Sequence, residues 1–329
     1  MARRASCRIE TIPISSPGPA ESDLTIDIAS FGPEDARRVI LHSSGLHGVE
    51  GFAGSAIQLQ LLDDFPSLPP DTALILVHIL NPYGMAWLRR VNSGNVDLNR
   101  NFLVGEQYSG APPAYAELDS FLNPRTPPSR DFYFLKAAWL ILRRGMPVLK
   151  QAIVGGQYEY PKGLFFGGWK VEEELEKYGN WLRQRLKSAE YVIAMDVHTG
   201  LGRFGEESLL VEPGNYETLR KSFGPRVVQL EAERGPAYRI RGGLQNLIYQ
   251  NALHAQVHFM GEEFGTYSAA RVLHALREEN RWHHYGRATM GHPVKTTMKE
   301  TFCPSAESWR RQVLERGAEW IRSAILTMH

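Results

Sequence analysis

Uninterrupted apolar runs constrain the fold of this sequence more than any other feature. The clearest are Ala73–Leu80, which reads ALILVHIL, and Tyr191–His198, which reads YVIAMDVH. A strand with one face in water alternates apolar and polar residues, so a short run without alternation indicates a strand buried on both faces. Such strands belong to parallel sheets covered by helices on both sides. The sequence therefore predicts an α/β fold.

Shorter apolar runs predict further strands, and apolar residues three or four positions apart predict helices. The additional strands are Leu24–Ala29, Val39–His42, Ser208–Val211 and Val257–Glu263. The helices are Gly54–Leu62, Ala114–Phe121, Phe132–Val148, Glu172–Lys187, Tyr216–Phe223, Ala269–Glu279 and Ser305–Thr327. Because strands and helices alternate along the chain, we expect a sandwich with a largely parallel central sheet.

Composition disfavours several classes of protein. The formal net charge is +1, which lacks the basic excess of a nucleic-acid-binding protein. No stretch approaches the roughly 18 apolar residues of a membrane span, and we expect no membrane partner. The N-terminal sequence carries arginines but not the apolar core of a secretory signal. The two cysteines, Cys7 and Cys303, form no CxxC motif, so we expect reduced structural thiols in a cytoplasmic protein.

No repeat, low-complexity tract or linker divides the chain. We therefore expect one domain, residues 1–329, with an inserted segment at about 103–190. Within that insert, residues 155–169 interleave glycines and aromatic residues. This loop is either a pocket wall, with Tyr158, Tyr160 and Lys162 facing a substrate, or a packed surface loop.

A histidine and a glutamate lie three residues apart in the turn Gly45–Gly51, which reads GLHGVEG. The turn follows the predicted strand Val39–His42, and sheets of this kind bind ligands at the carboxyl ends of their strands. His47 and Glu50 can converge on one ion from a single turn, and their donor atoms suit zinc. This motif alone is a weak signal, since a surface histidine and a helix-capping glutamate give the same pattern.

His198 ends another apolar strand, in the segment MDVHTG. A polar pair at the carboxyl end of a buried strand is hard to explain by packing. His198 would complete a set of three ligands with His47 and Glu50. Three protein ligands and one water are the open arrangement of a catalytic zinc, whereas a structural site normally closes with a fourth protein ligand.

Charged residues follow two further strands. The segment Arg90–Phe102 reads RVNSGNVDLNRNF, and its arginines can grip a carboxylate through two parallel hydrogen bonds. Glu262 and Glu263 lie at another strand end, where a metal-activated water needs a base. Their side chains point in opposite directions if the chain is extended, so at most one should face the site.

These four segments, in this order, resemble the zinc carboxypeptidase superfamily. The family pattern is HxxE, NP-G, R-N--G-DLNR, a strand-end His and a late Glu. The corresponding segments here read HGVE, NPYG, RVNSGNVDLNRNF, DVHTG and EEFGT. The match spans about residues 40–267, and the flanking segments resemble a bacterial branch of the superfamily. The resemblance implies a three-layer α/β/α sandwich around a mixed, largely parallel central sheet.

The resemblance also implies the roles of the metal-site residues. His47, Glu50 and His198 match the ligands of one zinc ion. Glu263 matches the general base and proton shuttle, because the family's glutamate precedes an apolar residue, as Glu263 does here. Glu262 is the weaker candidate for that role.

Four further residues match the family pattern, three on the substrate side and one beside a zinc ligand. Arg90 matches the arginine that helps to stabilise the tetrahedral oxyanion. Asn99 and Arg100 match the pair that binds the terminal carboxylate of the substrate. Asp97 matches the residue that orients the first zinc histidine and raises its basicity.

The sequence thus predicts a zinc metallocarboxypeptidase that acts on a small peptide. An N-acyl amino acid deacylase would keep the same zinc site with a narrower pocket, and the sequence barely separates the two. A non-catalytic binding protein would need a lost ligand or base. The family's peptide-cutting members also use a mobile tyrosine near the base, for which Tyr249 and Tyr267 are the candidates. The sequence leaves the oligomeric state open.

Overall fold

The computed structural model describes residues 7–145, 149, 151, 153, 155–230 and 240–328. These residues form an eight-stranded sheet in the order β1-β2-β4-β3-β5-β8-β6-β7. The strands are β1 Cys7–Ile14, β2 Leu24–Phe31, β3 Arg38–Ser44, β4 Thr72–His78, β5 Tyr191–Gly200, β6 Glu207–Val211, β7 Val227–Gln229 and β8 Gln256–Gly265. Strands β4, β3, β5 and β8 run parallel at the centre, while β1, β2 and β6 pair antiparallel. The sheet is therefore mixed with a parallel centre, as predicted.

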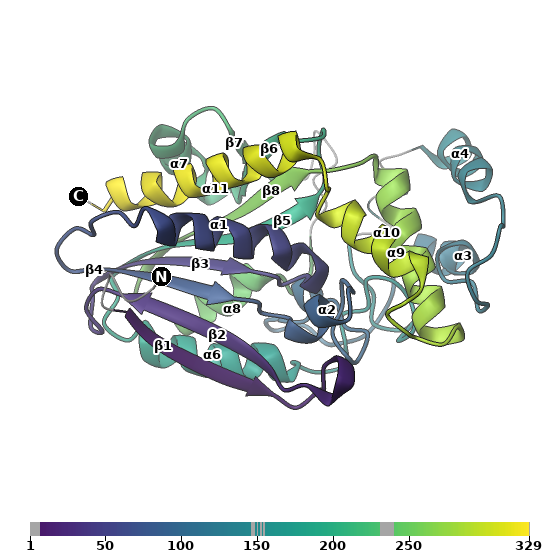
Figure 1. Ribbon diagram of the computed structural model, residues 1–329, viewed down its shortest axis with the longest axis horizontal. Helices are drawn as coiled ribbons and strands as arrows, with labels where there is room; N and C mark the ends of the chain where they lie inside the picture. Colours follow the sequence, from purple (N-terminus) through teal and green to yellow (C-terminus); the bar gives the residue numbers. More distant parts are fainter. Residues whose placement is uncertain are drawn as a thin grey trace.

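Helices cover both faces of this sheet (Figure 1). They are α1 Gly51–Asp63, α2 Pro82–Ala86, α3 Pro113–Leu122, α4 Tyr133–Arg144, α6 Glu173–Arg185, α7 Tyr216–Phe223, α8 Leu244–Asn251, α9 Ala269–Tyr285, α10 Pro293–Phe302 and α11 Glu307–Leu326. Helices α1 and α11 pack their apolar residues on one face of the sheet, and α6 and α8 pack theirs on the other. The predicted three-layer α/β/α sandwich is thereby confirmed.

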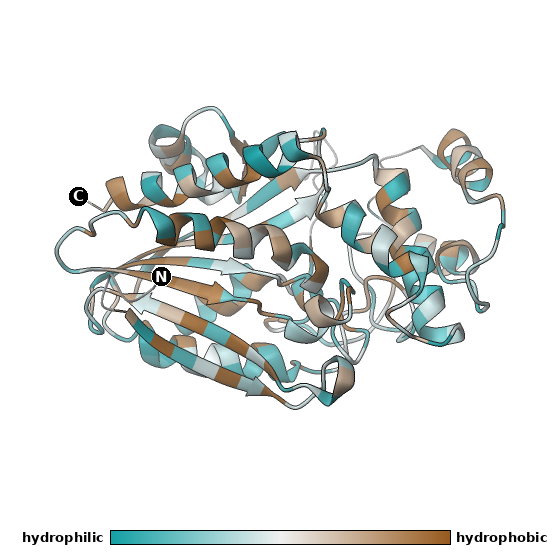
Figure 2. Ribbon diagram, in the orientation of Figure 1, coloured by the Kyte–Doolittle hydropathy of each residue, from teal (hydrophilic) through white to brown (hydrophobic). Residues whose placement is uncertain are grey.

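The central strands are buried because both of their faces meet a helical layer. In β4 every residue from Thr72 to Val77 is buried, and in β3 every residue from Val39 to Ser44 is buried. Figure 2 shows apolar colouring over most of β4 and the first part of β3, and an alternation of colours on β1 at the edge. Strand β4 ends two residues earlier than predicted, because Ile79 has a left-handed backbone with a φ of 61°.

Helices α3 and α4 lie between the segment of Leu98–Arg100 and strand β5, within the predicted insert. Part of this region packs with α9 and α10 into a third apolar cluster, which includes Tyr115, Leu122, Phe165, Val272 and Phe302. The helix predicted at Phe132–Val148 begins at Tyr133 and is seen to Arg144, and residues 146–148 lie outside the described residues. The single-domain assignment stays a prediction.

The sequence did not predict β1, β7, α2, α8 or α10. Among the described residues, no helix is both long enough and apolar enough to cross a membrane.

Candidate metal centre

The turn that carries His47 and Glu50 is shaped by glycines and by the neighbouring segment. Gly45 has a left-handed φ of 66°, which lets the chain reverse directly after β3. A Cβ on Gly48 would lie 2.2 Å from the backbone of Gly84, so a larger residue cannot fit there. The Gly48 and Val49 N–H groups donate to the carbonyls of Arg90 and Arg89 at 3.1 and 2.9 Å. Tight packing therefore fixes the turn.

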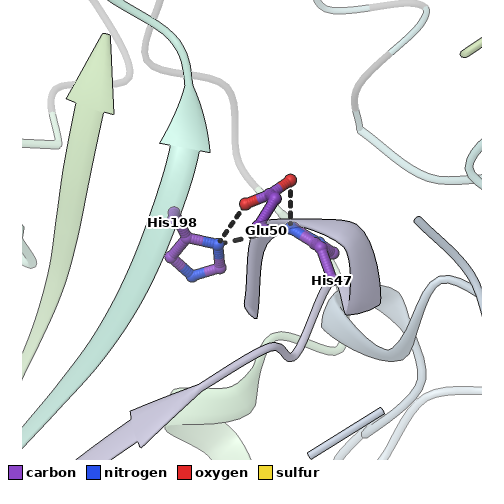
Figure 3. Close-up of side chains that lie close together, drawn as sticks. All are labelled: His47, Glu50 and His198. Atoms are coloured by element: carbon purple, nitrogen blue, oxygen red, sulfur yellow. Dashed lines mark hydrogen bonds and ion pairs between the residues drawn. The ribbon is translucent and has the colours of Figure 1, made fainter. Parts of the chain in front are cut away.

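Three ligand atoms converge at the carboxyl ends of β3 and β5 (Figure 3). The Nδ1 atoms of His47 and His198 are 3.3 Å apart. Glu50 places Oε1 3.2 Å from the first of these nitrogens and Oε2 3.6 Å from the second. Ligand atoms about 2.0–2.1 Å from a tetrahedral zinc are roughly 3.3–3.4 Å apart, so this spacing fits one ion. Among the described residues, this is the group of three His, Cys, Asp or Glu residues with metal-site spacing.

Each imidazole directs its other nitrogen toward a buried carboxylate. His47 Nε2 is 3.1 Å from Asp97 Oδ1, in the contact that the sequence predicted. His198 Nε2 is 2.8 Å from Asp196 Oδ2, and the sequence did not predict that partner. Such carboxylates orient a ligand ring and raise its basicity. The spacing could have revealed Asp196, since residues two apart on a strand share a face.

The carboxylates give the centre a charge that suits a cation. Burial raises the pKa of Glu50, but His47 and Arg90 outweigh that effect and bring it below its usual range. Burial lowers the pKa of His198, but Asp196 and Glu50 outweigh it and raise the pKa to about 10. A proton on His198 therefore takes the place that a metal ion would fill between the same groups.

Glu263 lies beside His198 on the neighbouring strand, since the two are register partners in the parallel pair of β5 and β8. Its Oε1 accepts a hydrogen bond from the Leu201 N–H at 2.8 Å. Burial raises the pKa of Glu263 to about 7, although His198 opposes the shift. A carboxyl group that titrates near neutrality is suited to accept and return a proton.

Glu262 points to the opposite face of the sheet, as the alternation of a strand requires. Its carboxylate is fully buried and lies 3.7 Å from Nε2 of His42, which is also fully buried. Of the two glutamates considered, the structure thus brings Glu263 to the metal centre and places Glu262 in the core.

Arg90 lies at the edge of the centre. Its Nη1 donates to Glu50 Oε1 at 2.7 Å and its Nε donates to Asp97 Oδ2 at 3.3 Å. Its side chain is 15% exposed, so a bound substrate can reach it.

Asn99 and Arg100 lie deeper in the wall. Arg100 is 2% exposed, its Nη1 donates to the Asn99 carbonyl at 2.9 Å, and the same atom is 3.9 Å from Asp97 Oδ1. Asn99 Oδ1 accepts from the Leu244 N–H at 3.2 Å. The structure brings this pair next to the centre, and their contact with a substrate carboxylate stays a prediction.

The loop of residues 155–169 packs over these arginines. The Tyr158 hydroxyl donates to the Arg100 carbonyl at 2.8 Å, and the ring of Tyr158 is buried. The Phe165 ring centre is 5.6 Å from the Arg90 guanidinium and 5.9 Å from that of Arg100. Phe165 has a φ of 58°, an uncommon conformation for a residue with a side chain. The loop therefore lies beside the centre through Phe165 and Tyr158, and the Tyr158 side chain is buried against the backbone of Arg100.

Tyr160 and Lys162 contact other parts of the chain. The Tyr160 ring is 5.4 Å from that of Tyr115, and Lys162 Nζ is 5.8 Å from the Tyr285 ring. A pocket beside Arg90 has both apolar and charged side chains in its walls, from the loop, from α9 and from the segment around Arg90. It is lined by Arg89, Arg90, Val91, Asn95, Gly163, Leu164, Phe165, Leu276, Glu279 and Asn280.

The two candidate tyrosines make contacts with other acidic residues. The Tyr249 hydroxyl donates to Glu212 Oε2 and the Tyr267 hydroxyl donates to Glu300 Oε1, both at 2.7 Å. These contacts single out neither tyrosine as a partner of the metal centre.

A family model described as "Protein of unknown function (DUF2817)" matches residues 1–316. Comparison with curated proteins gives no match. Among solved structures, bovine thrombin-activatable fibrinolysis inhibitor in complex with tick carboxypeptidase inhibitor is 12% identical, with a TM-score of 0.52 over 99% of this chain and 92% of its own.

Two other solved structures are similar to this chain with lower TM-scores. Carboxypeptidase A from Helicoverpa armigera is 13% identical, with a TM-score of 0.46 over 93% of this chain and 71% of its own. Murein-tripeptide amidase MpaA from Escherichia coli O157 is 19% identical, with a TM-score of 0.42 over 86% of this chain and 96% of its own. The chain therefore belongs to the family described as protein of unknown function DUF2817, and its fold is similar to that of thrombin-activatable fibrinolysis inhibitor.

Proposed function

We propose that this protein is a zinc-dependent hydrolase that cleaves an amide bond next to a carboxylate-bearing residue, in the manner of a metallocarboxypeptidase. The observation that carries the proposal is the convergence of His47, Glu50 and His198 at ligand spacing, with Glu263 beside them in register. Three ligands without a fourth are the arrangement of a catalytic zinc. A zinc ion held there would supply a Lewis acid that acidifies water and polarises a carbonyl.

The chain's own residues supply the proton transfer. The Leu201 N–H holds Oε1 of Glu263, which leaves Oε2 to take a proton from the attacking water. The same oxygen then returns the proton to the leaving amine. The raised pKa of Glu263, about 7 in the metal-free protein, favours both steps.

Arg90 and Arg100 supply positive charge on the substrate side. Arg90 is the reachable guanidinium next to Glu50, and we assign it to the developing oxyanion. Arg100, with Asn99, is proposed to anchor the substrate carboxylate, because an arginine grips a carboxylate through paired hydrogen bonds. Arg100 is 2% exposed, so this role requires the substrate to reach the guanidinium from inside the centre.

An N-acyl amino acid deacylase on the same scaffold is the second candidate. Phe165 lies against both guanidinium groups, and the buried Tyr158 closes the wall behind Arg100. A narrow centre of this kind favours a small acylated amino acid over a longer peptide. The ligands and the base would have the same roles.

Matched substrates distinguish the two activities. Zinc-loaded protein is assayed on blocked dipeptides and on N-acyl amino acids, each with a free or an amidated terminal carboxylate. Faster cleavage of the dipeptides supports the carboxypeptidase, and release of acyl groups alone supports the deacylase. Hydrolysis of either series that depends on Glu263 excludes a non-catalytic binding protein.

The anchor role is tested with Arg100→Ala. We expect a loss on substrates with a free carboxylate and little change on amidated ones. Arg203→Ala is the control, since Arg203 follows β5 but its side chain is 88% exposed. An equal loss on both kinds of substrate would argue against the anchor.

A further inference from the structure

Helix α4, Tyr133–Arg144, turns an apolar face away from the protein. Large apolar side chains on this helix and just before it are exposed: Phe132 by 75%, Phe134 by 56%, Leu135 by 70%, Trp139 by 55% and Leu142 by 88%. At about 100° per residue, the four side chains within the helix fall on one arc of about 140°. The helix lies at the extremity of the molecule in Figure 1 and carries apolar colouring in Figure 2.

Contacts on the opposite face of α4 hold the helix in this orientation. Tyr133 is buried, and its hydroxyl donates to the Ala270 carbonyl of α9 at 3.0 Å. Its ring stacks on His274 at 4.5 Å and on Phe121 at 5.2 Å. Arg281 holds the segment before the helix, with its Nη2 donating to the Pro127 carbonyl at 2.6 Å. The helix is therefore anchored with its apolar arc outward.

Basic residues border the apolar arc, and residues 132–145 contain no Asp or Glu. Lys136 and Arg143 lie on the same edge of the arc by helical position. Among the described residues, neither lies within 4.0 Å of a carboxylate, although the charge of Lys136 helps to lower the pKa of Asp131, which precedes the helix. The Arg143 guanidinium lies over the Trp139 ring, 5.1 Å from its centre. The occupant of this face must therefore be apolar at its centre and anionic at its edge.

A second copy of the chain packed antiparallel on this face does not meet that requirement. Two α4 helices packed antiparallel around a twofold axis would bring the same edges together, and Lys136 and Arg143 would face their own copies. Like charges so placed oppose association. An anionic bilayer offers an apolar interior below negative head groups, which matches the arc and its basic edge.

We propose that α4 lies on the surface of an anionic lipid bilayer, with Phe134, Leu135, Trp139 and Leu142 inserted and Lys136 and Arg143 at the head groups. Trp, Phe and Leu on one face with Lys or Arg beside them are typical of helices that lie in the plane of a membrane. The sequence-based expectation of no membrane partner rested on the missing span, which a surface helix does not need. The proposal is independent of the proposed hydrolase activity.

The test is co-sedimentation of the full-length protein with vesicles of phosphatidylcholine, with or without phosphatidylglycerol. We expect binding to the mixed vesicles, weaker binding in high salt, and little binding to phosphatidylcholine alone. Leu142→Glu should lower the partition constant by on the order of tenfold. Lys136→Gln and Arg143→Gln should each lower it by about fivefold.

Leu253→Glu is the matched control, because Leu253 is 77% exposed and lies outside α4. It should leave vesicle binding unchanged, and circular dichroism should show all variants folded. Equal binding of wild type and Leu142→Glu would overturn the proposal. So would a wild-type dimer that ignores vesicles and dissociates on Leu142→Glu, since that result identifies a second copy as the occupant.

Discussion

His47 and His198 have the same arrangement: one ring nitrogen faces the carboxylate of a buried aspartate, and the other faces the carboxylate of Glu50. The carboxylates differ in origin, since Asp97 comes from the loop after α2 and Asp196 from the strand that carries His198. Both are fully buried, and Asp196 Oδ1 also accepts a hydrogen bond from the Ser43 hydroxyl at 2.5 Å. The two ligand rings are thus held before any metal binds.

Replacement of His198 by Ala should abolish stoichiometric zinc binding, because the remaining pair cannot complete a three-ligand site. Glu263→Gln should keep its zinc, because Glu263 is assigned as a base and not as a ligand. Metal analysis of the purified, zinc-equilibrated variants measures both. One zinc per chain in His198→Ala would refute the ligand assignment.

Asp196→Asn should lower zinc affinity by about 10- to 100-fold, because the His198 ring loses its carboxylate partner. Competition with a chelating dye measures the affinity. Asp63→Asn, at the end of α1, is the control and should bind zinc as wild type does. A normal affinity in Asp196→Asn would show that Asp196 has no role in positioning the ring.

The cluster of His47, Glu50 and His198 could be predicted from the sequence because each residue stands in a short motif at a strand end. The strand alternation predicted that one glutamate at most faces the centre, and the resemblance selected Glu263. The contact of Asp196 with His198 was not predicted, although the two residues are two positions apart. An acidic residue on a buried strand was not considered as a partner of the histidine ring. The approach of the Phe165 ring to Arg90 and Arg100 could not be predicted, since it depends on a left-handed backbone conformation in a loop.

At the scale of elements, β8 carries one glutamate to each face of the sheet. On the face away from the metal centre, neither carboxylate oxygen of Glu262 has a hydrogen-bond partner among the described residues. Burial raises the pKa of Glu262, and His42 only partly offsets that effect. The folded protein therefore favours a protonated Glu262, whereas the unfolded chain releases this proton above a pH of about 4.3.

Glu262→Gln should remove a pH-dependent loss of stability. A group with a raised pKa binds more proton in the folded state, so wild-type stability falls as the pH rises from about 4.3 to the folded-state pKa. The loss approaches about 1.4 kcal/mol per pH unit in that window, and a neutral glutamine does not suffer it. Denaturant unfolding of metal-free proteins at several pH values measures this difference. Parallel pH profiles for the two proteins would contradict it.

The central strands could be predicted because burial on both faces leaves uninterrupted apolar runs. Strand β1, CRIETIPI, was missed because it is an edge strand that alternates exposed polar residues with apolar ones over a short length. Helices α8 and α10 were missed because their sequences, LQNLIYQN and PVKTTMKETF, contain Asn, Thr and Val residues of low helix propensity. Their positions depend on tertiary packing.

In the whole molecule, the metal centre joins distant parts of the chain. His47 and His198 are 151 residues apart, and they meet because β3, which leads into the turn of His47, pairs with β5, which carries His198. The strand order that makes them neighbours follows from packing between helices and sheet, and apolar runs alone do not give it. The sequence could therefore predict the layers and the grouping of His47, Glu50 and His198, but not the order of the strands or the packing of residues 155–169.

Zinc should stabilise the whole fold, because it binds the folded arrangement of ligands and not the unfolded chain. At a free concentration about 1,000 times the dissociation constant, the stabilisation is about 4 kcal/mol. A melting curve with zinc and with a chelator measures this as a rise in Tm, which His198→Ala should lack and Glu263→Gln should retain. An equal rise in His198→Ala would place the zinc elsewhere.

Hydrolysis by zinc-loaded wild-type and Glu263→Gln proteins, compared on one library of peptides and N-acyl amino acids, tests the central claim most directly. Mass spectrometry reads the products. We predict that the wild type shortens peptides at the carboxyl end or releases acyl groups, and that Glu263→Gln is slower by about 100- to 10,000-fold at equal zinc content. Equal product formation by both proteins would contradict the assignment of Glu263 as the base beside a metal held by His47, Glu50 and His198.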